Sequence, residues 1–247
     1  MAIRPIYFPE PLTEGVVRSR MTPFTMEVEL GGDVMPCRCP TTWHIGNLEV
    51  GGRPCLLSRN DGTAHKTPFT VEAVSMDAPD AVNKKWIGIN QTAMNRYFEH
   101  YLEQGGFPEM VNPGGMVRRE RLSGKANLDF IAGGAAIAVK APLVVLGLDV
   151  PEAMRARDRR QVLPTERFAA RIMSLKKNAP SKRVVLVLVY LYDRPDVRTS
   201  DYSEYYDAVI PVLELMKSLE LEVWQANFIV TKESVYLDRY KLLNLME

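Results

Sequence analysis

Residues 129–140 read Asp-Phe-Ile-Ala-Gly-Gly-Ala-Ala-Ile-Ala-Val-Lys and predict a two-stranded hairpin with a central Gly-Gly turn. Side chains two residues apart on a strand share a face, so Ala138 and Lys140 point the same way and are folded back towards Asp129. An acid at position 138 would complete a cage in which two carboxylates hold a divalent cation and the lysine orients a phosphate, as in metal-dependent phosphodiester cleavage. Alanine cannot bind a metal. The segment therefore predicts the framework of such a site without its second acid.

The overall composition is that of a soluble globular protein with one large domain or two small ones. Hydrophobic residues make up 46% of the 247 residues and charged residues 25%, which is enough apolar material for a sizeable core. The formal net charge is +1 at pH 7, so the charge balance neither favours nor excludes a polyanionic partner. The first residues contain no apolar run of signal-peptide length, and the most apolar stretch, residues 184–192, is too short to span a bilayer. We therefore expect a cytoplasmic protein without membrane association.

The three cysteines are expected to be reduced and buried. Cys37 and Cys39 would share one face of a strand, and no second Cys/His pair lies nearby to close a tetrahedral zinc site with them or with Cys55. Free cysteine usually behaves as a small buried hydrophobe. Zinc is not expected.

Short strands separated by turn residues dominate the first part of the chain. The expected strands are residues 24–30, 54–58 and 69–76. Such spacing predicts a small β-barrel or sandwich. The polar segment 77–83 is typical of a connector, so we predict a barrel domain over residues 1–80 and a second domain over residues 81–247.

The second part of the chain alternates helical and strand patterns. The expected elements are helices at 92–104, 165–177 and 203–218, the hairpin, a buried central strand at 183–192 and a last strand at 222–230. Pro211 lies inside the third helix as a kink or an early stop. This order predicts a mixed α/β sheet domain.

Six short segments, taken together and in this order, resemble one known family. They are residues 8–15 (Phe-Pro-Glu-Pro-Leu-Thr-Glu-Gly), 66–72 (Lys-Thr-Pro-Phe-Thr-Val-Glu), Asn95-Arg96, residues 128–130 (Leu-Asp-Phe), residues 137–140 (Ile-Ala-Val-Lys) and residues 165–167 (Thr-Glu-Arg). Their order and spacing are similar to those of the sugar fermentation stimulation protein family. The resemblance implies an N-terminal OB-like β-barrel joined to a domain of the PD-(D/E)xK nuclease fold. It also implies binding of nucleic acid, because the family is described both as a regulator-type DNA binder and as a nuclease.

The departures from the family pattern fall mainly on the residues that would do the chemistry. The family has a glutamate where this chain has Ala138, and an acid after Asn-Arg where this chain has His100 with Glu99 beside it. Residues 168–171 read Phe-Ala-Ala-Arg where the family continues with Gly-x-Lys-His. Nuclease activity is therefore predicted to be absent or much reduced.

Asp129 and Lys140 have two interpretations, as remnants of a metal and phosphate site or as an ordinary ion pair at a strand end. A single carboxylate holds Mg²⁺ or Mn²⁺ weakly, because such ions require several oxygen ligands. The acids that could move into the vacancy are Glu99, Glu120 and Glu166. His100 is either a nitrogen ligand or proton carrier, or a half-buried structural residue.

Basic residues gather in three stretches, either as ordinary surface charge or as contacts to phosphates. The first stretch holds Arg118, Arg119, Arg121 and Lys125, and the second holds Arg155, Arg157, Arg159, Arg160, Arg167 and Arg171. The barrel adds Arg38, Trp43, His44, Arg53 and Arg59, a mixture that OB-type surfaces use for base stacking and backbone contact, although Trp43 suits a core equally well.

The leading hypothesis is a protein that binds DNA or RNA across the junction of the barrel and the nuclease-like domain, with a degenerate nuclease site. The first alternative is an active nuclease in which Asp129 and a relocated acid hold Mg²⁺ or Mn²⁺ while Lys140 stabilises the transition state. The second alternative is a protein-interaction module that has lost both activities.

Overall fold

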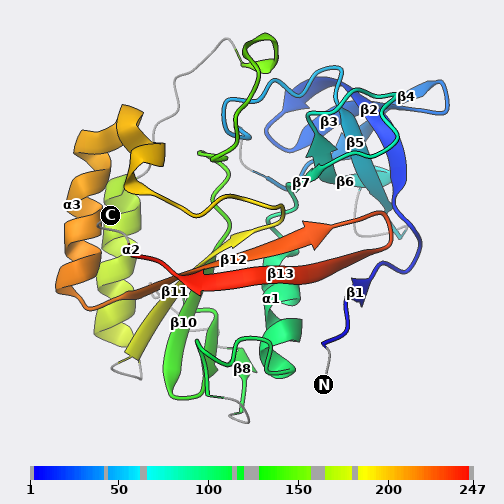
Figure 1. Cartoon of the computed structure of the whole chain (residues 1–247). Coiled ribbons are helices and arrows are strands. Elements are labelled where there is room, and N and C mark those ends of the chain that lie inside the picture. The colour runs from blue at the N-terminus through cyan, green and yellow to red at the C-terminus, as the bar shows by residue number, and fades with distance from the viewer. Residues whose placement is uncertain are drawn as a thin grey trace.

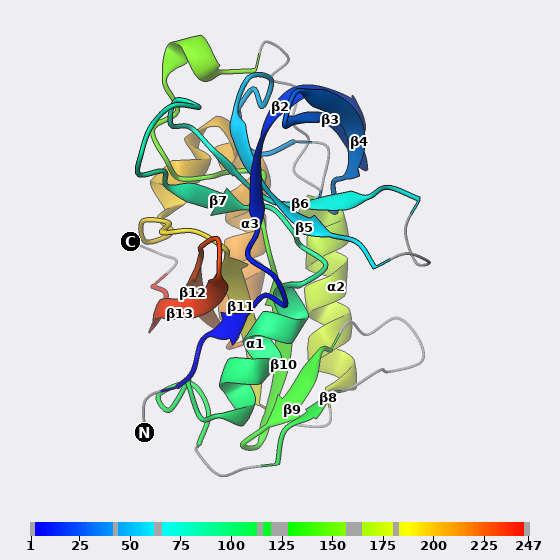
Figure 2. The same ribbon diagram turned by 90° about the vertical axis from the view of Figure 1, so that its right-hand side faces the viewer.

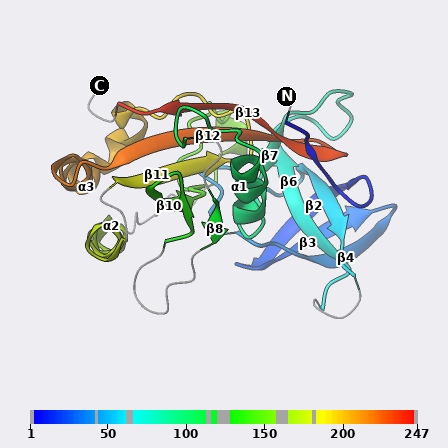
Figure 3. The ribbon, with the colours of Figure 1, turned by 90° about the horizontal axis from the view of Figure 1, so that it is seen from below.

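The computed structural model describes residues 3–41, 44–61, 66–112, 116–119, 128–156, 165–179 and 183–244. It contains a β-barrel and a mixed sheet with helices on both faces (Figure 1). In Figure 2 the barrel lies above the mixed sheet, and Figure 3 shows α1 between the barrel on one side and α2 and α3 on the other.

The barrel is closed and has the OB-like strand order. Its strands are β2 (Thr13–Thr22), β3 (Thr25–Leu30), β4 (Asp33–Arg38), β5 (Pro54–Arg59) and β6 (Phe69–Ser75), with β7 (Trp86–Gly88) paired to the edge of β6. The hydrogen-bonded order is β4-β3-β2-β5-β6, and a parallel bridge from Arg38 to Thr70 closes β4 onto β6. Numbered along the chain this is 1-2-3-5-4-1, the connectivity of an OB-fold. The predicted OB-like barrel is confirmed.

The mixed sheet is built around three parallel strands. In spatial order it contains β1 (Ile6–Tyr7), β13 (Ser234–Leu242), β12 (Glu222–Val230), β11 (Arg183–Tyr190), β10 (Ala135–Lys140), β9 (Phe130–Ala132) and β8 (Arg118–Arg119). The strands β10, β11 and β12 are parallel, and their nearly continuous apolar sequence suits burial on both faces. This arrangement confirms the predicted mixed α/β sheet domain.

Helices cover the two faces of this sheet. They are α1 (Met94–Glu103), α2 (Thr165–Asn178) and α3 (Tyr206–Ser218), with 3₁₀ turns η1 (Glu152–Met154) and η2 (Thr199–Tyr205). The apolar stripe of α1, which includes Tyr97 and Tyr101, packs with Val185 and Val187 of β11. The helices α2 and α3 pack on the opposite face with Ala138 and the alternate residues of β11. Because Ala138 belongs to this second face, so does Lys140 two residues later.

Three details differ from the sequence-based expectations. The strand at 222–230 is not the last, because β13 follows it; the pairing of the two strands shifts between Asn227 and Phe228, and such a bulge breaks the alternation that would signal the strand. Pro211 lies inside α3 and does not end it. The non-helical residue Tyr202 instead interrupts η2, and Tyr205, which is also non-helical, directly precedes α3.

The chain crosses between the two sheets near both ends of the barrel. The first strand, β1, pairs with β13 of the mixed sheet, whereas β7, beyond residue 80, still belongs to the barrel sheet. The domain boundary at residues 80 and 81 therefore stays a prediction. Within the described residues, none of the helices has the length and apolar character that a membrane span requires.

The three cysteines are free and buried, as predicted. Burial raises the pKa of Cys37 and Cys39 to about 11 and that of Cys55 to about 12. A thiol with so high a pKa is protonated at neutral pH and is a poor nucleophile.

Candidate functional site

The predicted hairpin is confirmed, and it holds Asp129 firmly in place. Gly133 and Gly134 have φ angles of 54° and 79°, a conformation that glycine adopts without strain, and they join β9 to β10. The backbone N–H of Asp129 donates to the carbonyl of Ile137 at 3.0 Å. The carboxylate accepts two more hydrogen bonds, both at 2.9 Å, from the backbone N–H of Val139 and from the side-chain amide of Asn95. Asp129 therefore ties the hairpin to the start of α1.

Lys140 ends β10 and lies half-buried near Asp129. Within the described part of the chain it makes no hydrogen bond and no ion pair. Burial lowers the pKa of the Lys140 ammonium, the negative charge of Asp129 partly opposes this, and the positive charge of Arg171 on α2 adds to it. The hairpin thus presents a partly desolvated cation next to an acid whose oxygens are already bonded.

The residues present do not fit a cage for a divalent cation. Ala138, which is 2% exposed, offers no side-chain ligand atom, so Asp129 is the one carboxylate that the described residues of the hairpin supply. Among the described residues, no group of three or more His, Cys, Asp or Glu side chains lies close enough together to hold a metal ion. A hard divalent cation requires more oxygen ligands than Asp129 supplies.

The structure places the candidate replacement ligands in different surroundings. Glu99 forms an ion pair with Arg119 of β8. Glu166 is exposed on the first turn of α2, and Glu120 lies outside the described residues. The Nε2 atom of His100 lies 2.9 Å from the carbonyl oxygen of Arg4, so this side chain is directed at the N-terminal segment.

Gln91 joins the end of the barrel to the end of the hairpin. Its backbone N–H donates to the carbonyl of Pro40 at 3.2 Å, and the hydroxyl of Thr41 donates to its side-chain carbonyl at 3.1 Å. Its side-chain amide donates to the carbonyl of Ala141, which directly follows Lys140. The ends of β4 and β10 are therefore neighbours at one junction between the two sheets.

A second carboxylate at this junction, Glu72 of β6, is not among the candidates from the sequence. It is 7% exposed and accepts hydrogen bonds from the Ser58 hydroxyl at 2.7 Å and the Asn90 amide at 2.8 Å. Burial raises its pKa, and the hydrogen bonds from Ser58 and Asn90, followed by the positive charges of Arg96 and Arg38, partly oppose the rise. The signal available in the sequence was the pair of asparagines, Asn90 and Asn95, on either side of the start of α1.

The predicted basic residues are distributed over both sheets and the helices. Arg38 is half-buried at the end of β4, and Arg53 is directed at the carbonyl of Met76 at 3.4 Å. Exposed cations are Arg59, Arg118, Arg119, Arg167 and Arg171, and Arg155 and His44 are half-buried. Outside the described residues lie Trp43, Arg121, Lys125, Arg157, Arg159 and Arg160. Arg96, which the sequence analysis named only as part of the segment Asn95-Arg96, is exposed. Its positive charge lies close enough to Glu72 to affect the pKa of that carboxyl group.

Comparisons with known proteins bear on this architecture. No protein-family model matches the chain. A sugar fermentation stimulation protein homolog of Synechococcus sp. (strain JA-2-3B'a(2-13)) is 34% identical over 143 residues, which are 55% of this chain and 56% of the relative. The homolog of Synechocystis sp. (strain ATCC 27184 / PCC 6803 / Kazusa) is 24% identical over 233 residues, 91% of this chain and 92% of the relative.

The first of these alignments, like most of the others, covers only about half the length of the relative. A solved structure, described as Pyrococcus furiosus SfsA in complex with Ca²⁺, matches with a TM-score of 0.69 and 14% identity over 99% of both chains. At that identity the match shows the fold alone. Together these likenesses confirm the resemblance that the sequence motifs predicted.

Proposed function

We propose that this divergent relative of the sugar fermentation stimulation proteins is a cytoplasmic protein that binds DNA or RNA across the junction of its two sheets, and that it cleaves the bound strand slowly or not at all. The proposal is carried by the cations that four elements bring to the junction, which are Arg38 of β4, Arg96 of α1, Lys140 of β10 and Arg171 of α2. Arg38 and Arg96 both act on the pKa of Glu72, and Arg171 acts on that of Lys140, so each pair is close in space.

Cations from separate elements that meet along one junction are suited to the phosphates of a nucleic-acid backbone. Neutralising phosphates releases condensed counterions, so such binding weakens steeply as the salt concentration rises. Gln91 fixes the end of β4 against the end of β10, and this fixed geometry supports contacts from both sheets to one strand.

Slow or absent cleavage is supported by the hairpin. Position 138 lacks an acid, and Asp129 is the one carboxylate left among the described residues of the hairpin. The Pyrococcus furiosus protein was solved with Ca²⁺, which favours the alternative that this chain also uses a divalent cation, Mg²⁺ or Mn²⁺, as a nuclease. That alternative requires a further acid ligand beside Asp129.

The test is fluorescence anisotropy with end-labelled single- and double-stranded DNA and RNA over a salt series, with Mg²⁺ or Mn²⁺ present so that cleavage is followed in the same samples. The wild type is compared with the double variant Arg38→Ala/Arg96→Ala. Lys217→Ala is the matched control, because Lys217 is an exposed cation in the last turn of α3. In the double variant the slope of the logarithm of the association constant against the logarithm of the salt concentration should become less negative by about 2, since each lost phosphate contact removes about 0.9. Lys217→Ala should leave the slope unchanged.

Three results would change this conclusion. Equal binding by the wild type and the Arg38→Ala/Arg96→Ala variant would move the contact surface away from the junction. Cleavage that disappears in Asp129→Ala would establish the nuclease in place of the pseudo-nuclease. Binding to none of the four nucleic acids at low salt would leave the protein-interaction module as the remaining function.

A further inference from the structure

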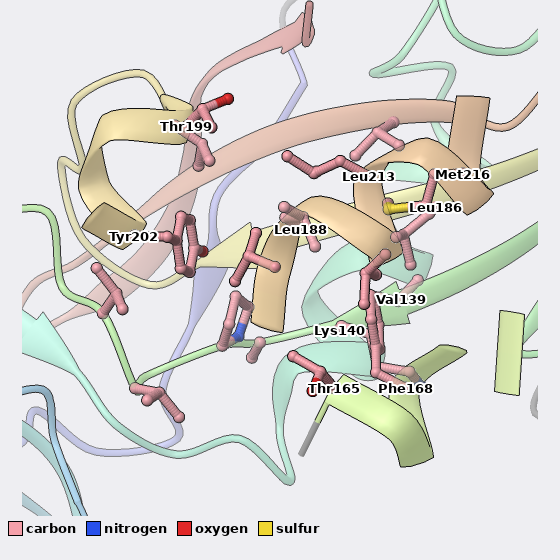
Figure 4. A pocket seen from close by; sticks show the side chains of 18 of the residues that line it. Val139, Lys140, Thr165, Phe168, Leu186, Leu188, Thr199, Tyr202, Leu213 and Met216 are labelled. Atoms are coloured by element: carbon pink, nitrogen blue, oxygen red, sulfur yellow. The ribbon is translucent and has the colours of Figure 1, made fainter. Parts of the chain in front are cut away.

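A pocket of about 630 Å³ lies between the mixed sheet and the helices α2 and α3. Figure 4 shows Leu186 and Leu188 of β11 facing Leu213 and Met216 of α3 across it, with Phe168 of α2 beside them. The pocket has room for roughly 20 water-sized volumes, and it falls within the size range of small-molecule sites, about 300 to 1,000 Å³. Its walls are almost entirely aliphatic and aromatic, which suits an apolar ligand body.

Polar groups are concentrated where β10 and α1 reach the pocket. Lys140, Asp129 and Asn95 all line it. Asp129 and Asn95 are bonded to each other, with the side-chain amide of Asn95 donating, whereas Lys140 has no hydrogen bond or ion pair within the described residues. Two polar groups at this end of the pocket are therefore open to a ligand head: the ammonium of Lys140, which is a donor, and the buried Oδ1 of Asn95, an acceptor without a hydrogen-bond partner among the described residues. Of these, the ammonium is the one that can pair with an anion.

The charges around the pocket favour an anion. Of the described residues that line it, Asp129 is the one acid, and its two oxygens already receive hydrogen bonds from Asn95 and Val139. The cations Lys140 and Arg198 line the pocket, and Arg171 lies close enough for its positive charge to lower the pKa of Lys140. A neutral ligand would leave the half-buried ammonium without a partner, which is costly in an apolar surrounding, and a cationic ligand would be repelled.

Ala138, which stands where the related family has a glutamate, also keeps the sheet next to Lys140 apolar. Ala138 pairs in register with Leu186, and the side chain of Leu186 lines the pocket. A glutamate at position 138 would place a second negative charge on the face that the pocket occupies, one strand position from Lys140 on that face. The loss of the acid and the presence of an anion-selective pocket are therefore compatible features of one surface.

We infer that this pocket binds an amphipathic monoanion, a carboxylate with an apolar body of the size of a medium-chain fatty acid, whose carboxylate pairs with Lys140. Ligand binding in the pocket does not depend on nucleic-acid binding, but the two sites share Lys140, so a bound carboxylate would compete with a phosphate for this ammonium. The apolar chain would lie between β11 and α3, and the carboxylate would lie at the end of β10.

The test is calorimetric titration of the full chain, without nucleic acid, using decanoate and 1-decanol below their aggregation limits. The two probes have the same chain and differ in the charge of the head. Wild type should bind decanoate at least about tenfold more tightly than 1-decanol, the size expected for a hydrogen bond to a charged group. Equal affinity for the two probes, or binding of neither, would overturn the inference without any variant being needed.

Variants locate the site. Lys140→Met keeps the aliphatic stem and should abolish the preference for decanoate. Leu213→Trp fills the pocket from α3 and should weaken the binding of both probes. Lys217→Met, on the same helix but exposed, is the control and should change neither affinity. Retention of the preference in a folded Lys140→Met protein would show that another group holds the carboxylate and would overturn the assignment.

Discussion

Two carboxylates at the junction have similar hydrogen-bond partners and different environments. Glu72 of the barrel accepts an amide hydrogen bond from Asn90, and Asp129 of the hairpin accepts one from Asn95, so both are attached to the start of α1. Glu72 is 7% exposed and its pKa is raised by burial, whereas Asp129 is half-buried beside Lys140 at the edge of a pocket. Depth of burial, rather than the bonding partner, therefore distinguishes the enclosed acid of the barrel from the acid at the edge of a pocket.

The largest expected effect is the loss of stability on replacing Glu72. Glu72→Ala leaves the buried donors of Ser58 and Asn90 without an acceptor and creates a small cavity, which should lower the free energy of unfolding by about 3 kcal/mol. Urea denaturation followed by circular dichroism measures this change.

Asp129→Ala is the matched substitution at the other carboxylate. It also removes the acceptor of one asparagine amide, but water can reach the pocket edge, so the loss should be about 1 kcal/mol. If both substitutions lowered the free energy of unfolding equally, the difference in burial would not explain the difference between the two acids.

Ala138→Glu adds a carboxylate on the face of β10 that carries Lys140. Because position 138 is 2% exposed, the new charge should lower the free energy of unfolding by about 2 kcal/mol when no metal is present. Mn²⁺ should restore part of that loss, because Asp129 and the new glutamate could then both bind the ion. Calorimetry should detect the bound Mn²⁺.

The combination of Ala138→Glu with Asp129→Asn is the control for this gain. It should show the same destabilisation and no recovery with Mn²⁺. If Ala138→Glu alone gained no metal affinity, the hairpin would lack more of a metal site than the single acid.

The contrast between the two carboxylates also separates what the sequence could predict from what it could not. The hairpin at Asp129 was predictable because alternation and a Gly-Gly turn are local signals. The burial of Glu72 was not, because it depends on contacts with residues distant in sequence, among them Ser58 and Asn90. The pocket depends on the spacing between α3 and β11, which no local pattern encodes, and the bulge at Asn227 and Phe228 concealed the last strand pairing.

The smallest expected effect is a pH dependence that originates at Glu72. Because its pKa is raised above the ordinary value of 4.5, the folded protein binds a proton at this site more tightly than the unfolded chain does. Stability from this group is fully present below pH 4.5 and is lost as the pH rises through the higher pKa of the folded state. Each unit of the shift corresponds to about 1.4 kcal/mol.

Glu72→Gln removes this titration and keeps a side chain that can both accept and donate a hydrogen bond, as protonated Glu72 does. The free energy of unfolding of this variant, relative to the wild type, should therefore increase as the pH is raised from 4.5 towards neutrality. Glu103→Gln, at an exposed position near the end of α1, controls for the loss of one negative charge. A relative stability of Glu72→Gln that stayed constant or fell over this range would mean that the hydrogen bonds from Ser58 and Asn90, together with the charges of Arg96 and Arg38, outweigh burial. Glu72 would then be held as an ion, and the two carboxylates would be more alike than their burial indicates.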